Sequence, residues 1–241
     1  MHPGPLIGLA GFVLLVAVLV RSRSRRRPRV ADPHEVRPNT ALMQYAAATG
    51  CRYAPRATPA DTDLVLDTGL RDRAIHDIVR GTRGAWPFVA YSLVTTKTPT
   101  SGEASAVEVA IGRALQIPLQ HRVPTPLMAG PRTAVTAAMG LLAIHGQEFE
   151  SGEFNDKVFV RCADPRLASA IIDPRMMETL LELPAMTWGL HDSRLIVVER
   201  FETDPIIAAM HPLTPSWIEQ AADFAAAVAA HIPPVVWSLY P

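Results

Sequence analysis

The sequence has few of the residues that mark cross-links or metal centres, and it carries no excess of charge. Only two cysteines occur, Cys51 and Cys162, and neither has a second Cys or His at metal-ligand spacing, which excludes a disulfide scaffold and a thiolate metal site. Charged residues make up 19% of the chain and the formal net charge is +0, so we expect no nucleic acid partner. Hydrophobic residues make up 49%, which argues against a disordered body.

Recognisable catalytic motifs are also missing. The sequence has no Gly-x-Ser-x-Gly elbow, no phosphate-binding glycine loop and no dinucleotide fingerprint. His191-Asp192-Ser193 has the residue types of a hydrolase triad, but neighbours in a tight turn cannot face one another as a triad requires, so we interpret it as a hairpin turn. His145 and Glu148 lack a third ligand at motif spacing. We therefore predict no enzyme, no metal and no cofactor.

Charge is absent from the first 20 residues, and the chain is almost entirely apolar from Pro5 to Val20. About 20 residues at about 1.5 Å rise each match a hydrocarbon core about 30 Å thick, so we predict a transmembrane helix over residues 1–20. A secretory signal peptide is the main alternative, but it needs a basic region before the apolar run. Here the basic residues follow the run, and they are Arg21, Arg23, Arg25, Arg26, Arg27 and Arg29.

This arginine cluster predicts the orientation of the anchor. Lys and Arg are retained on the cytoplasmic face, so we expect a single pass through the inner (plasma) membrane with the N-terminus outside and the soluble domain cytoplasmic. Contact of the cluster with anionic lipid headgroups is a second possible role. In a reducing cytoplasm Cys51 and Cys162 would be free thiols, whereas the opposite orientation would let them pair.

Prolines divide the rest of the chain. They mark residues 21–38 as a basic stalk and the stretch 118–131 as the border between a first lobe, 39–131, and a second lobe, 132–241. The predicted fold class is α/β, of the α+β kind, with two similar mixed sheet-and-helix lobes behind one transmembrane helix. The prolines of the stalk are Pro28, Pro33 and Pro38.

Caps and apolar periodicity predict the individual elements. Two Asp-Pro pairs open helices, because the carboxylate accepts amide donors that a helix start leaves without partners and the proline has none to satisfy. The predicted helices are 40–48, 166–171, 175–183 and 215–230, capped by Asn39, Asp164, Asp173 and Thr214. One strand is predicted to start at Cys51, and another at Ile75–Arg80, although its apolar residues alternate imperfectly. The other predicted strands are Trp86–Val94, Val107–Ile117, Phe154–Cys162, Thr187–Leu190 and Arg194–Glu199. Turns are predicted at 81–84 and 191–193.

Several short motifs in this layout resemble a known family. They are Gly50-x-x-Tyr53, Trp86-Pro-Phe-Val-Ala-Tyr91, Phe154-Asn155-x-x-Val158-x-Val160, Asp164-Pro-Arg-x-Ala168, Pro174-Arg-Met-Met177 and Ile232-Pro-Pro-x-x-Trp237. With the N-terminal span and basic stalk, they resemble membrane-anchored actinobacterial proteins typified by the trehalose monomycolate transport factor A. The resemblance implies a cytoplasmic α/β domain of two similar lobes, without enzymatic activity, that assists an envelope lipid transporter.

Four residues are candidate contacts to a partner: Arg166, Arg175, Met176 and Met177. The arginines lie in first helical turns, where they could hold a phosphate or a partner carboxylate, although we favour a structural role in which Asp164 and Asp173 already satisfy those helix starts. Methionines are most often core residues, and a pliable surface for a partner helix or an acyl chain is the alternative. We interpret as packing anchors the four tryptophans, Trp86, Trp188, Trp217 and Trp237.

These observations predict a non-enzymatic, membrane-anchored accessory or adaptor protein. We expect its partner to be an inner-membrane protein complex, namely a polytopic transporter of mycolate-type envelope lipid, and its contact with membrane lipid to be the N-terminal helix. A domain that binds a lipid or another small ligand is the alternative, because the apolar content is high. The least favoured hypothesis is an unrecognised hydrolase, for which the candidates are His145, His191 and Asp192.

Overall fold

The computed structural model describes most of the chain beyond residue 37, namely residues 38–58, 61, 64, 73–97, 108–132, 146–201 and 212–239. The predicted transmembrane helix at 1–20, the arginine cluster at 21–29 and His145 lie outside the described residues. Among the residues that are described, no helix combines the length and the apolar character that crossing a membrane requires.

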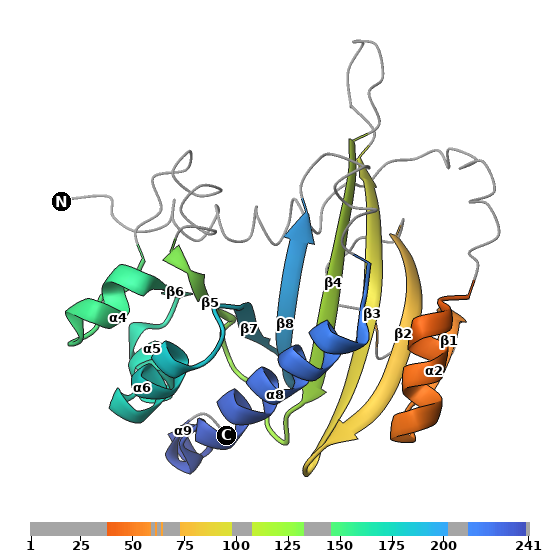
Figure 1. Cartoon of the computed structure of the whole chain (residues 1–241). Coiled ribbons are helices and arrows are strands. Elements are labelled where there is room, and N and C mark those ends of the chain that lie inside the picture. Colours follow the sequence, from red (N-terminus) through yellow and green to blue (C-terminus); the bar gives the residue numbers. More distant parts are fainter. Residues whose placement is uncertain are drawn as a thin grey trace. The chain divides into compact units, whose positions relative to one another are not determined.

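Helices and strands alternate irregularly along the chain. The strands are β1 Arg52–Arg56, β2 Arg73–Arg83, β3 Trp86–Lys97, β4 Glu108–Pro118, β5 Leu127–Pro131, β6 Val158–Cys162, β7 Thr187–His191 and β8 Arg194–Phe201. The helices are α2 Thr40–Thr49, α4 Gly152–Lys157, α5 Pro165–Ile171, α6 Pro174–Glu182, α8 Pro215–His231 and α9 Pro234–Leu239. The strands form one sheet in the order β1-β2-β3-β4-β8-β7-β5-β6 (Figure 1). Antiparallel pairing joins β5 to β6, β5 to β7 and β7 to β8, so the fold is a mixed α/β one on an antiparallel sheet.

The chain divides into two compact units, each assembled from separate stretches of sequence. The first unit comprises Met1–Val79, Tyr91–Gly112 and Arg200–Pro212. The second unit comprises Arg80–Ala90, Arg113–Glu199 and Leu213–Pro241. The predicted lobes, 39–131 and 132–241, are continuous in sequence, and that two-lobe division stays a prediction.

Side-chain caps begin the helices where the sequence predicts them. Asn39 accepts a hydrogen bond from the Leu42 amide at 3.2 Å, and α2 ends at Gly50, whose φ of 74° is left-handed. Asp164 opens α5 by accepting from the amides of Arg166 and Leu167, at 2.9 and 3.2 Å. The caps of α6 and α8 are the predicted Asp173 and Thr214.

We expect Asp164→Ala to lower the free energy of unfolding by about 1 kcal/mol, because two amides at the start of α5 lose their acceptor. Urea unfolding followed by circular dichroism measures the loss. Asp156→Ala is the matched control, since Asp156 is an exposed carboxylate inside α4 and not a cap. Equal losses in the two variants would contradict the capping explanation.

One predicted strand is in part a helix. The sequence predicts extended chain over 154–162, but the chain is helical in α4 as far as Lys157. Ser151 caps α4 by accepting from the Phe154 amide at 3.2 Å, and Lys157 pairs with Glu153 one turn earlier at 2.7 Å. These local contacts favour the helix over the strand that the apolar residues suggested.

Two further segments differ from the expectation. The proline-rich stretch 118–131 contains β5, which pairs with β6 on one side and β7 on the other; its proline, Pro131, is the last residue of the strand, where a missing amide costs least. The β2–β3 hairpin turns only at Gly84 and Ala85, so residues 81–83 extend β2 and do not form the predicted turn. Gly84 has a φ of 58°, which glycine adopts without strain.

Large side chains fill the core of the second unit. Trp188, 1% exposed, lies on β7 with its ring 6.5 Å from that of Phe224 on α8. Trp217 is also buried, and the Arg113 guanidinium lies 4.9 Å from its ring centre while bonding Glu199 at 2.7 Å. Trp188 and Trp217 are therefore packing anchors, as predicted, whereas Trp86 and Trp237 are only partly buried.

Candidate functional site

The first unit contains a polar network that joins the start of α2 to β1 and β2. The Asn39 backbone N–H donates to the Tyr53 hydroxyl at 2.9 Å, and that hydroxyl donates to Asp77 Oδ1 at 2.7 Å. The other carboxylate oxygen, Oδ2, lies 3.0 Å from His76 Nδ1. We call Tyr53, Asp77 and His76 the Tyr-Asp-His network.

The backbone of Asp77 makes this arrangement possible. Neighbouring side chains in a regular strand point to opposite faces of the sheet, so His76 and Asp77 would not normally meet. Asp77 has a φ of 54°, in the left-handed region, which interrupts the alternation and allows the contact between neighbours. A non-glycine residue costs about 1–3 kcal/mol in such a conformation, and it persists only where its surroundings hold it, most often at functional sites.

Burial strengthens the network. The Asp77 and His76 side chains are 12% and 24% exposed. Burial and the hydrogen bond to Asp77 raise the pKa of Tyr53 to about 12, so its hydroxyl stays protonated and donates to the carboxylate at neutral pH. A carboxylate can only accept, so His76 Nδ1 carries a proton and donates it to Asp77 Oδ2.

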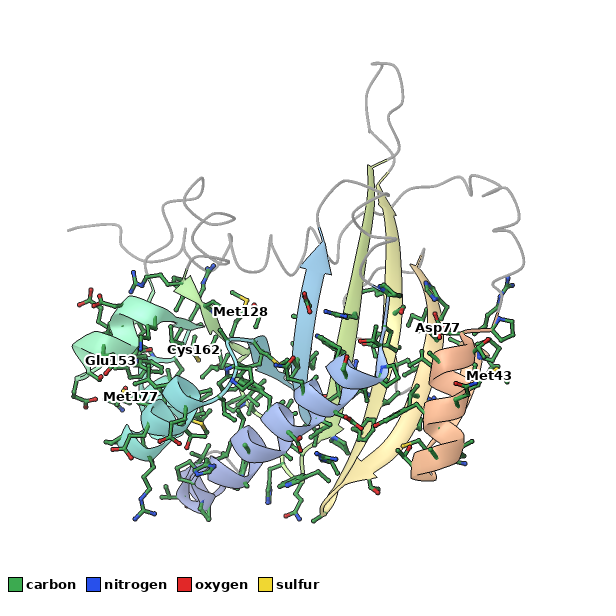
Figure 2. The ribbon with its side chains drawn as sticks, viewed as in Figure 1. Met43, Asp77, Met128, Glu153, Cys162 and Met177 are labelled. Carbon is green, nitrogen blue, oxygen red and sulfur yellow. The ribbon has the colours of Figure 1, made fainter. Side chains whose placement is uncertain are left out.

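A second feature of the first unit is the surface of α2. The ten residues of α2 include no charged side chain, yet seven of them are exposed. Leu42 and Ala46 are buried, and Met43 is 48% exposed. Figure 2 labels Met43 on α2. We call α2 surface the exposed group Ala41, Met43, Gln44, Ala47 and Ala48.

The four predicted contact residues divide into two kinds. Arg166 and Arg175 are exposed in the first turns of α5 and α6, beside the Asp caps that already accept the amides. Met176 and Met177 are 0% and 4% exposed, so they are core residues and form no accessible surface, which corrects the binding alternative for this pair. Apolar packing explains the correction, because both lie on the buried face of α6 with Leu180.

The His191-Asp192-Ser193 stretch is a turn and not a triad. Asp192 has a φ of 53° between β7 and β8, and its carboxylate pairs with Arg122 at 2.9 Å. The backbone oxygens of Asp192 and Ser193 accept hydrogen bonds at 2.8 Å from the amides of the loop that follows β4. The turn prediction is confirmed, and the Asp192 carboxylate and the two backbone oxygens have structural partners.

Neither cysteine is in a disulfide. Cys51 and Cys162 are both free thiols that are partly buried, and burial raises the pKa of Cys162. Within the described ranges, no three His, Cys, Asp or Glu residues are grouped as metal ligands.

The Tyr-Asp-His network is not predicted from the sequence. Two signals pointed to it: the Gly50-x-x-Tyr53 motif and the broken alternation at His76 and Asp77. Neither signal could bring the residues together, because Tyr53 and Asp77 are 24 positions apart.

Comparison with known proteins gives a distant likeness only. No family model matches the chain, and no curated protein sequence matches it. The chain is similar to the crystal structure of the mycobacterial trehalose monomycolate transport factor A, TtfA, with a TM-score of 0.48 and 8% sequence identity. The alignment covers 80% of this chain and 93% of that one.

Proposed function

We propose that this protein is a non-enzymatic accessory protein, anchored in the inner membrane by residues 1–20, whose cytoplasmic domain docks on an integral membrane complex through the α2 surface. The observation that carries the proposal is the lack of charge on a helix with seven exposed residues. An exposed helix face normally carries charged residues because it is turned to water. A charge-free face is typical of a surface that a partner covers.

The composition of the α2 surface favours a helical partner. Small residues such as Ala47 and Ala48 let a second helix approach closely, and an exposed methionine adapts its shape to fill gaps between the two. In the sequence, α2 follows directly on the predicted stalk at 21–38, so the stalk would keep this helix within reach of partners in the same membrane. The motif resemblance over Phe154–Met177 supports a transporter of mycolate-type envelope lipid as the class of partner.

We expect Met43→Glu to reduce capture of the partner at least about tenfold, because docking would bury an unpaired carboxylate. The measurement is affinity purification of the tagged full-length protein in mild detergent from its own membrane. Wild type should recover a multi-span membrane protein. Glutamate near the start of a helix is compatible with folding, so a loss of capture would report on the surface.

Val235→Glu is the matched control, because Val235 is an exposed apolar residue, 54% exposed, on α9 of the second unit. It should leave capture unchanged. Recovery of wild type alone at native abundance would contradict the accessory function, and full capture by Met43→Glu would contradict the α2 surface as the docking face.

A further inference from the structure

We propose that the Tyr-Asp-His network is a latch that fixes α2, and with it the α2 surface, against the sheet. That the latch presents the α2 surface to a partner rests on the proposed docking function. That the latch fixes α2 does not, and the two statements can be tested separately.

Asn39 connects the latch to α2. Its side chain caps the Leu42 amide at 3.2 Å, and its backbone oxygen accepts from the Met43 amide at 3.0 Å. The Asn39 backbone N–H donates a hydrogen bond to the Tyr53 hydroxyl. The first turn of α2, which includes Met43 of the α2 surface, is therefore joined by one hydrogen bond to the Tyr53 hydroxyl of β1.

Tyr53 connects the start of α2 to β2. Its hydroxyl accepts from Asn39 and donates to Asp77, which phenylalanine could not do. His76 engages the second carboxylate oxygen of Asp77, so both oxygens have a partner and the carboxylate is fixed in direction.

Few residues of α2 are buried, so the latch contributes a large share of the interactions that hold this helix in place. Leu42 and Ala46 are the buried residues of α2. A helix with so small an apolar contact opens locally more easily than the core does. The left-handed backbone of Asp77 allows the contacts but is strained, so the strand would relax once the carboxylate lost its partners.

The test is hydrogen–deuterium exchange with mass spectrometry on the full chain in detergent. We expect Tyr53→Phe to speed exchange of the 39–43 amides about fivefold to tenfold, because the Asn39 amide loses its acceptor and Asp77 Oδ1 loses its donor. Exchange in α8 should stay the same, which also shows that the variant is folded. Asp77→Asn should have a smaller effect, since asparagine tolerates a positive φ and keeps an oxygen for Tyr53.

Thr49→Ala is the control within α2, because it removes a side-chain hydrogen bond to the Tyr45 carbonyl at the other end of the helix. It should leave exchange of the 39–43 amides unchanged.

Unchanged exchange in Tyr53→Phe would overturn the latch, whatever happens to capture. Faster exchange together with full partner capture would overturn its docking role, and faster exchange with reduced capture supports the whole inference. Met43→Glu, by contrast, should reduce capture without changing exchange, so failure of the docking function and failure of the latch are distinguishable.

Discussion

Gly189→Ala is expected to lower the free energy of unfolding by about 3 kcal/mol. A Cβ atom at Gly189 would lie 2.7 Å from the Leu127 carbonyl oxygen, closer than real Cβ contacts allow. That oxygen belongs to the backbone of β5, which pairs with β6 on one side and β7 on the other, so it cannot move away cheaply. Strands β5 and β7 would have to separate to admit the methyl group.

The matched control for this variant is Gly152→Ala. Gly152 begins α4, and an added Cβ there meets nothing within 4 Å, so the substitution should be neutral or slightly stabilising. Denaturant unfolding of both variants, compared by midpoint at constant slope, gives the two changes in free energy. Equal stability of Gly189→Ala and wild type would show that β5 and β7 are not packed this closely.

Phe154→Ala is expected to lower the free energy of unfolding by about 3–5 kcal/mol, because it leaves a cavity in a fully buried site. Phe154 is 0% exposed on α4 and meets Phe149 edge to face, with ring centres 5.6 Å apart. Asn155 closes the same loop by bonding the Phe149 amide and carbonyl, at 2.9 and 2.7 Å. Phe154 and Asn155 therefore both hold the loop at Phe149, one by ring packing and the other by hydrogen bonds.

Phe149→Ala is the comparison for Phe154→Ala, since it removes the other ring of the pair from a position that is only partly buried. Its loss of stability should be clearly smaller, in the same denaturant experiment. If the two variants lost the same free energy of unfolding, the ring contact alone would explain the loss in Phe154→Ala, and the burial of Phe154 would not contribute.

Part of the candidate site was accessible to sequence reasoning. Tyr53 stood out in a motif, Asn39 was predicted as a cap, and the irregular alternation at His76 and Asp77 was visible in the sequence. The hydrogen bonds that join them span 14 positions from Asn39 to Tyr53 and 24 from Tyr53 to Asp77. No local pattern specifies which strands become neighbours, so the network could not be assembled from the sequence.

Among the described helices, the sequence by itself determined where α2, α5, α6 and α8 begin, because a cap such as Asp164 acts on amides two and three positions away. It also determined the β7–β8 turn and, through the distribution of charge, the expectation of an anchor at 1–20. Only the tertiary structure decided that Met176 and Met177 are buried, that a strand runs through the proline-rich stretch at 127–131, and that Tyr53 meets Asp77. Burial and long-range hydrogen bonds depend on which elements pack together, and that is a property of the whole fold and not of neighbouring residues.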